Sequence, residues 1–199
     1  MRTVLVTGAS RGLGLEFVRQ LRARGDTVLA ACRGGPSAQL DALGAEFVPL
    51  DVSSEASIEA LGRRLVARPL DVLINNAGVS SEAKTVAALT GAELSRVFTA
   101  NAFAPMLVAK ALLPSLRAGR GRVVFSLSSQ LASLTNNTSG GSSYAYRASK
   151  SALNMLNLQL AHELKPEGFC CVAVHPGWVR TDMGGPQAPL SPEQSVAGM

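Results

Sequence analysis

Cysteine and aromatic residues are scarce in this sequence. The three cysteines, two of them adjacent at Cys170 and Cys171, are too few and too poorly spaced for a disulfide framework or a zinc site. Aromatic residues make up 5% of the chain and hydrophobic residues 47%, so the apolar content is mostly small and aliphatic. Helices packed closely on a buried sheet require such a composition. We expect a protein of a reduced, cytoplasmic compartment, without a metal.

Long hydrophobic runs are absent as well. None approaches the roughly 20 residues that a membrane-spanning helix needs. The apolar run Thr3–Thr7 meets a glycine-rich turn at once, which does not fit a signal peptide. We therefore expect a soluble protein that has no membrane partner.

The chain has a shortage of acidic residues, and its formal net charge is +5. The arginines are spread along the chain, and no basic run with interleaved aromatic residues occurs. Without such a patch, a solvated basic surface is the simpler explanation of the charge. We expect no nucleic-acid partner.

Two kinds of segment alternate along the chain. Longer stretches with apolar residues at the helical period separate short β-rich runs, most of them apolar on both faces, as in strands buried inside a parallel sheet. The expected strands are Thr3–Thr7, Thr27–Cys32, Glu46–Leu50, Val72–Ile74, Arg122–Leu127 and Phe169–His175. This alternation predicts an α/β protein with a Rossmann-type, doubly wound parallel sheet in three layers. No linker or repeat appears, so residues 1–199 form one expected domain.

The last residues open a helix. Ser191 is the expected N-cap, Pro192 the first helical residue, and Gln194 the partner in a capping box. Because the chain ends one or two turns later, we expect an incomplete C-terminus.

A glycine-rich turn, Thr7-Gly8-Ala9-Ser10-Arg11-Gly12-Leu13-Gly14, follows the first expected strand. Its glycines allow a sharp turn, close approach of a pyrophosphate and close packing of the next helix, whose N-terminus favours phosphate. A tight turn without a ligand is the alternative. Because a strand precedes the turn and an amphipathic helix follows it, we expect nucleotide binding.

Charge indicates which nucleotide. An NAD site usually has a carboxylate after the second strand, whereas this chain has Ala31-Cys32-Arg33 there. Arg11 adds a second guanidinium nearby, and arginine forks bind phosphate oxygens well. The pair favours the 2′-phosphate of NADP(H), although Arg33 as an ordinary loop residue remains an alternative.

Tyr146 and Lys150 are spaced to share one face of a long helical stretch that runs to Leu164. A phenol with a pKa near 10 exchanges protons poorly at neutral pH, whereas a nearby ammonium favours the phenolate. A tyrosine tuned in this way can protonate a carbonyl oxygen as hydride arrives. An amphipathic helix with a surface pair is the alternative.

The order of the motifs resembles that of single-domain short-chain dehydrogenases/reductases over almost the entire chain. The motifs are the turn Thr7–Gly14, Asp51-Val52, Asn75-Asn76-Ala77-Gly78, Asn101, Ser128-Ser129, Tyr146–Lys150 and Pro176-Gly177. The stretch Asn136–Gly141, leading to Tyr144–Arg147, further resembles the carbonyl-reductase and C-factor-like branch.

The resemblance implies roles for the site residues. Tyr146 is the expected acid/base, Lys150 its tuner, Ser129 the holder of the carbonyl oxygen, and Asn101 the anchor of a relay water. Asp51 would hold the adenine amino group, and Val179 and Thr181 would touch the carboxamide. The full set expected to bind NADP(H) is Gly8, Ser10, Arg11, Gly12, Leu13, Gly14, Arg33, Asp51, Val52, Asn76, Ala77, Gly78, Tyr146, Lys150, Pro176, Gly177, Val179 and Thr181.

Two departures leave alternatives open. The segment between Ser129 and Tyr146 is longer than usual in the family, so Ser128 and Ser133 compete with Ser129 for the catalytic role. The family normally has a further helix and strand, so the expected last strand, Phe169–His175, becomes a poorly covered edge.

The expected function is transfer of a hydride between NADP(H) and a small carbonyl or alcohol substrate. A cofactor-binding regulatory or signalling protein with little turnover is the alternative. Because family members are commonly dimers or tetramers, a homo-oligomer is also implied.

Overall fold

The computed structural model describes residues 1–35, 37–138 and 143–199. Its strands are β1 (Thr3–Thr7), β2 (Thr27–Cys32), β3 (Glu46–Pro49), β4 (Val72–Asn75), β5 (Val123–Leu127) and β6 (Cys170–Val174). Its α-helices are α1 (Gly12–Ala23), α2 (Ala38–Ala42), α3 (Glu55–Leu65), α4 (Gly91–Phe98), α5 (Ala104–Ala118), α6 (Tyr144–Leu164) and α7 (Pro192–Ala197). Each predicted strand is present, with ends that differ by one residue or not at all.

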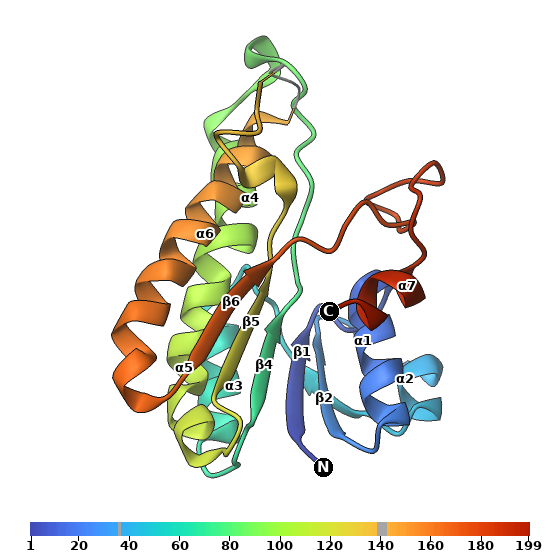
Figure 1. The fold of residues 1–199 in the computed structure, drawn as a ribbon, viewed down its shortest axis with the longest axis vertical. Coiled ribbons are helices and arrows are strands. Elements are labelled where there is room, and N and C mark those ends of the chain that lie inside the picture. Colours follow the sequence, from blue (N-terminus) through green and yellow to red (C-terminus); the bar gives the residue numbers. More distant parts are fainter. Residues whose placement is uncertain (36, 139–142) are drawn as a thin grey trace.

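All six strands form one parallel sheet in the order β3-β2-β1-β4-β5-β6. Helices lie on both of its faces, so the predicted Rossmann-type fold in three layers is confirmed (Figure 1). The order of the strands reverses between β1 and β4. In open α/β sheets, ligands bind beyond the carboxyl ends of the strands at such a reversal.

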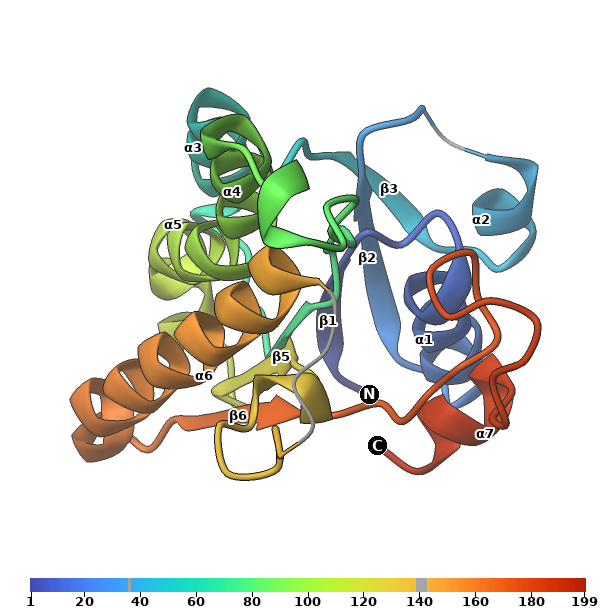
Figure 2. The same cartoon turned by 90° about the horizontal axis from the view of Figure 1, so that it is seen from above.

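One helical layer, seen most clearly from above, contains α3, α4, α5 and α6 (Figure 2). Alternate residues of the central strands, among them Leu5, Leu73 and Val124, are fully buried against this layer. Burial of one such leucine contributes about 1.5–3 kcal/mol to stability. Packing within this layer fixes the position of α6, and α6 carries the predicted Tyr146–Lys150 pair.

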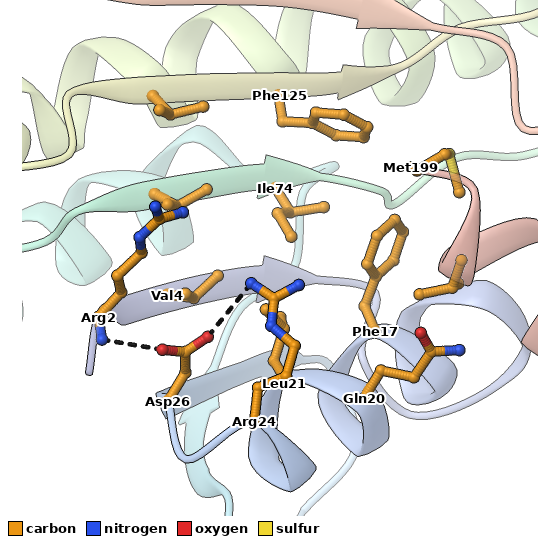
Figure 3. Close-up of a pocket in the computed structure, with 13 residues that line it drawn as sticks. Arg2, Val4, Phe17, Gln20, Leu21, Arg24, Asp26, Ile74, Phe125 and Met199 are labelled. Atoms are coloured by element: carbon orange, nitrogen blue, oxygen red, sulfur yellow. Dashed lines mark hydrogen bonds and ion pairs between the residues drawn. The ribbon is translucent and has the colours of Figure 1, made fainter.

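The opposite layer contains α1, α2 and α7, and it covers the sheet only in part (Figure 2). Val4 and Ile74 point into a groove of about 180 Å³ that is bounded by Phe17 of α1 and Met199 (Figure 3). The half-buried Phe125 of β5 lines the same groove. Beyond it, β6 forms the edge of the sheet, as predicted, with Cys170 and Ala173 exposed.

The expected C-terminal helix is α7. Ser191 accepts a hydrogen bond from the Gln194 amide, and the Gln194 side chain accepts one from the Ser191 amide, so the predicted capping box is present. The Ser195 hydroxyl donates to the carbonyl oxygen of Pro176 at 2.6 Å. This bond ties α7 to the segment that follows β6.

One helical stretch among the described residues, Gly91–Ala118, is long and apolar enough by length and composition to cross a membrane. This finding corrects the expectation that no apolar run approaches that length. Half of its most apolar window is buried, and Val108, Leu112 and Leu116 lie in the core. Core helices of soluble proteins have the same composition, so packing accounts for this stretch.

Candidate active site

The glycine-rich turn connects β1 to α1 at the carboxyl edge of the sheet. Gly8 and Gly12 have positive φ angles of 65° and 54°, a conformation that side chains other than glycine rarely adopt. A Cβ atom on Gly14 would lie 2.2 Å from the carbonyl oxygen of Gly8. Glycine at position 14 therefore allows α1 to start directly beneath the turn.

The N-terminus of α1 has free hydrogen-bond donors. Its N-cap, Arg11, makes no side-chain cap, and no acidic residue occurs in the first turn. Main-chain N–H groups and the positive end of the helix dipole are thus available to an anion. Of the other predicted residues here, Ser10 is exposed, whereas Leu13 packs partly on the core of the α1 layer.

Residues after β4 hold the glycine-rich turn from the other side of the strand reversal. Asn76 donates from Nδ2 to the carbonyl oxygens of Thr7 and Gly8, at 2.8 and 3.2 Å. The Thr7 hydroxyl accepts from the amides of Asn76 and Ala77, both at 3.0 Å. The structure therefore places Asn76 and Ala77 against the glycine-rich turn. The contribution of Thr7 was missed, although its position between the strand and Gly8 was a usable signal.

The two predicted phosphate-binding arginines have different surroundings. Arg33 is exposed after β2, and its charge helps to hold the pKa of Asp51 below the usual value, after the larger effect of hydrogen bonds from Ser53. Arg11 makes a 2.5 Å ion pair with Asp182, a partner that the sequence did not predict. Val52 lies beside Asp51 and packs on the core.

Helix α6 begins at Tyr144, so Tyr146 and Lys150 both lie in its first turns. Lys150 is buried, and its Nζ lies 6.0 Å from the centre of the Tyr146 ring. That Nζ donates to the main-chain oxygen of Leu127, at the end of β5, at 2.6 Å. The predicted pair is thus brought together at the carboxyl edge of the sheet.

The electrostatics of this pair differ from the sequence expectation. Burial raises the pKa of the Tyr146 phenol, and a hydrogen bond with the Ser129 hydroxyl lowers it by less. Burial also lowers the pKa of Lys150 to about 8. The expectation that the ammonium dominates and favours the phenolate is therefore wrong for this state of the protein, because desolvation has the larger effect.

The three candidate serines lie in distinct environments. Ser128 is buried and donates its hydroxyl to Oδ1 of Asn154 at 2.6 Å. Ser133 accepts from the amide of Asn136 at 3.1 Å. Ser129 accepts from the Leu131 amide at 3.1 Å, and its hydroxyl acts on the Tyr146 phenol by lowering the pKa of that phenol. Of the three, Ser129 alone affects the pKa of the Tyr146 phenol within the part of the chain that the structure describes.

Asn101 lies in a π-helical turn, Thr99–Phe103, between α4 and α5. Such turns often occur at functional sites. Asn101 is fully buried, accepts from the Val79 amide at 2.8 Å, and donates to the Val79 carbonyl at 2.9 Å and to Ser149 at 3.1 Å. The Asn101 side chain therefore holds Val79, in the loop that follows Asn76–Gly78. A Cβ atom on Gly78 would lie 3.1 Å from its Oδ1 and 3.8 Å from Nζ of Lys150.

The segment after β6 covers the start of α1. Gly177 has a φ of 82°, Val179 is buried, and Thr181 lies against Gly12, with Cγ2 at 3.5 Å from the place of a Gly12 Cβ. Pro176 is tied to α7 through Ser195. The predicted residues of this segment thus lie at the same edge of the sheet as the glycine-rich turn.

The branch-specific stretch is described only in part. Of the branch-specific stretch Asn136–Gly141, the residues Ser139, Gly140 and Gly141 lie outside the described residues. Within residues 1–35, 37–138 and 143–199, no group of three or more His, Cys, Asp or Glu side chains could hold a metal ion.

Known proteins resemble the chain along most of its length. C-signal of Myxococcus xanthus is 48% identical over 142 residues, which cover 71% of this chain and 85% of that protein. The 1-hydroxy-2-glutathionyl-2-methyl-3-butene dehydrogenase of Rhodococcus sp. (strain AD45) is 38% identical, over 100% of this chain and 89% of that protein.

Solved structures agree. An NADPH-bound carbonyl reductase from chicken fatty liver has a TM-score of 0.89 and 37% identity, covering 100% of this chain and 89% of that one. The carbonyl reductase Sniffer of D. melanogaster has a TM-score of 0.91 and 34% identity, covering 98% and 88%. A family model described as short chain dehydrogenase matches residues 2–189. The chain therefore belongs to the short chain dehydrogenase family, in its carbonyl-reductase and C-factor-like branch.

Proposed function

We propose that the protein transfers a hydride between NADP(H) and a carbonyl or alcohol substrate, with Tyr146 as the general acid/base. The observation that carries this proposal is the placement of Tyr146 one helical turn from the buried Lys150, whose Nζ lies 6.0 Å from the centre of the Tyr146 ring, with Ser129 acting on the same phenol. The oxidoreductases of known activity among its relatives support it.

The carboxyl edge of the sheet, at the start of α1, suits NADP(H). Supporting this fit are the uncapped N-terminus of α1 and the close approach that Gly14 permits. Two relatives were crystallised with such a cofactor, the chicken carbonyl reductase with NADPH and a Burkholderia multivorans protein, 32% identical, with NADP. When bound, NADPH supplies the hydride for reduction of the carbonyl carbon.

Specific residues would hold the cofactor. The turn from Gly8 to Gly14 binds the pyrophosphate, and Arg11 and Arg33 bind the 2′-phosphate. Asp51 takes the adenine amino group, and Val179 and Thr181 contact the carboxamide. The remaining contacts come from Ser10, Leu13, Val52, Asn76, Ala77, Gly78, Tyr146, Lys150, Pro176 and Gly177.

Tyr146 gives its phenolic proton to the substrate oxygen. The raised pKa of this phenol keeps it protonated at neutral pH, which suits the direction of reduction. Ser129 holds the same oxygen by a hydrogen bond and so aligns it with the phenol. The products of this direction are an alcohol and a phenolate, which must regain a proton before the next cycle.

Lys150 and Asn101 support that proton transfer. With a pKa of about 8, Lys150 is mostly an ammonium at neutral pH, and it stabilises the phenolate that forms. Both amide hydrogens of Asn101 are used, by Val79 and Ser149. A relay water at Asn101 would therefore donate a hydrogen bond to an oxygen atom of Asn101.

A direct test is the loss of NADPH absorbance with a panel of aldehydes and ketones. We expect turnover of at least some carbonyl compounds with NADPH and slower turnover with NADH. Tight NADPH binding without turnover of any compound, and equal behaviour of Tyr146→Phe, would overturn the enzyme assignment.

That outcome would favour the second candidate, a cofactor-binding signalling protein with little turnover. The 48% identity to C-signal is the observation that favours this second candidate.

We also propose a cytoplasmic homo-oligomer, a dimer or tetramer, without membrane or nucleic-acid partners. The exposed Met155 and Leu158 on α6 support self-association. Analytical ultracentrifugation tests this part, and a monomer at micromolar concentration would contradict it.

A further inference from the structure

An ion pair joins the glycine-rich turn to the segment after β6. Nη1 of Arg11 lies 2.5 Å from Oδ2 of Asp182, and the two side chains are 74% and 78% exposed. Next to this pair, Gly12 lies against Thr181. Two neighbouring contacts thus hold residues 181–182 over the start of α1.

The guanidinium of Arg11 has a second proposed partner besides Asp182, because the proposed function assigns Arg11 to the 2′-phosphate. A carboxylate and a phosphate compete for the same cationic fork and repel each other when both are close to it. The other proposed phosphate-binding residue, Arg33, lies near the carboxylate of Asp51, whose pKa it helps to lower. Each of the two arginines is therefore partly neutralised by a neighbouring acid.

We propose that Asp182 is a specificity-determining residue, whose carboxylate competes with the 2′-phosphate of NADPH for Arg11 and so limits the preference for NADPH over NADH. The inference rests on the proposed function, because it assumes that Arg11 binds that phosphate. NADH has a hydroxyl in place of the phosphate, so its binding does not depend on this competition.

The size of the effect follows from exposure. Exposed ion pairs are weak and are screened by salt, so removal of the carboxylate should change the NADPH affinity by about twofold to fivefold at low ionic strength. A second exposed pair, between Arg19 of α1 and Glu193 at 3.3 Å, also joins α1 to the C-terminal segment. It lies outside the proposed phosphate site and provides a matched control.

The experiment is a fluorescence titration of the full chain with NADPH and with NADH. The variants are Asp182→Asn, Arg11→Ala, the double variant and the control Glu193→Gln. Asp182→Asn should lower the Kd of NADPH by about twofold to fivefold and leave that of NADH unchanged, with a smaller gain at high salt. The gain should vanish in the Arg11→Ala background and be absent in Glu193→Gln.

Equal effects of Asp182→Asn on both cofactors would overturn the inference. So would an undiminished gain in the Arg11→Ala background, or weaker NADPH binding by Asp182→Asn. The proposed function fails separately, if the unmodified chain does not prefer NADPH and Arg11→Ala has no effect. An NADPH preference that needs Arg11 but ignores Asp182→Asn would refute the inference alone. Circular dichroism of each variant checks that the fold is intact.

Discussion

The ammonium of Lys150 lies 6.0 Å from the centre of the Tyr146 ring, and Lys150 is buried. Its recorded hydrogen bond goes to the carbonyl oxygen of Leu127, not to the phenol. In this state of the protein, Lys150 is thus anchored to the end of β5. Its charge is ready to stabilise a phenolate that forms only when the proton is transferred.

The buried Lys150 should make stability depend on pH. Its pKa falls from 10.5 to about 8 on folding, so between these values the unfolded chain binds more protons and the free energy of unfolding rises with pH. The full slope is about 1.4 kcal/mol per pH unit. The raised pKa values of Tyr146 and Cys171 act in the opposite direction at higher pH.

Urea unfolding of the wild type and of Lys150→Met across this range isolates the contribution of Lys150, because the other groups are common to both proteins. The stability of the wild type relative to Lys150→Met should increase from pH 8 towards pH 10. A difference that is constant or decreases over this range would show that the lysine does not titrate in this way.

Ser129→Ala should lower kcat for carbonyl reduction by roughly 100-fold or more, because it removes a donor to the developing oxyanion. Ser128→Ala is the matched control, since that hydroxyl is committed to Asn154. It should instead cost about 1 kcal/mol of stability, with a small effect on kcat. Steady-state kinetics and urea unfolding of both variants check this prediction, and the opposite pattern would assign the catalytic role to Ser128.

Gly14→Ala should destabilise the protein by about 1–3 kcal/mol and abolish tight NADPH binding, because the added methyl group meets main-chain atoms of the turn. Gly91→Ala is the control, since nothing lies within 4 Å of its added Cβ. Thermal unfolding and NADPH titration measure both effects. Unchanged binding by Gly14→Ala would remove the turn from the cofactor site.

Arg33→Ala should weaken NADPH binding by about 10-fold to 100-fold, in keeping with the loss of one charge-assisted contact of about 1.5–3 kcal/mol, and should change NADH binding little. Arg63→Ala, on the exposed face of α3, is the control for net charge. Isothermal titration with each cofactor gives the ratio. Equal losses for NADPH and NADH would refute a role at the 2′-phosphate.

Much of this architecture could be predicted from the sequence, because it depends on local patterns. Buried parallel strands read as short apolar runs, and the glycine spacing and the spacing of Tyr146 and Lys150 follow from single elements. The cap of α7 at Ser191 is equally local. These features need no knowledge of which elements meet in space.

Features that depend on distant segments could not be predicted. The choice between Ser128 and Ser129 depends on how the chain turns after β5, where Ser128 meets Asn154 of α6. The pairing of Arg11 with Asp182 joins segments far apart in the chain. The pKa of Tyr146 depends on its burial, which the spacing of Tyr146 and Lys150 does not reveal.

The most direct test of the account is NADPH oxidation by the wild type and by Tyr146→Phe, with one carbonyl compound found in the panel and with NADPH affinity measured in parallel. We predict that the substitution lowers kcat by roughly 100-fold or more while the Kd of NADPH changes by less than about threefold, because only the proton donor is lost. Activity of Tyr146→Phe within a few-fold of wild type would contradict the central claim that Tyr146 is the general acid.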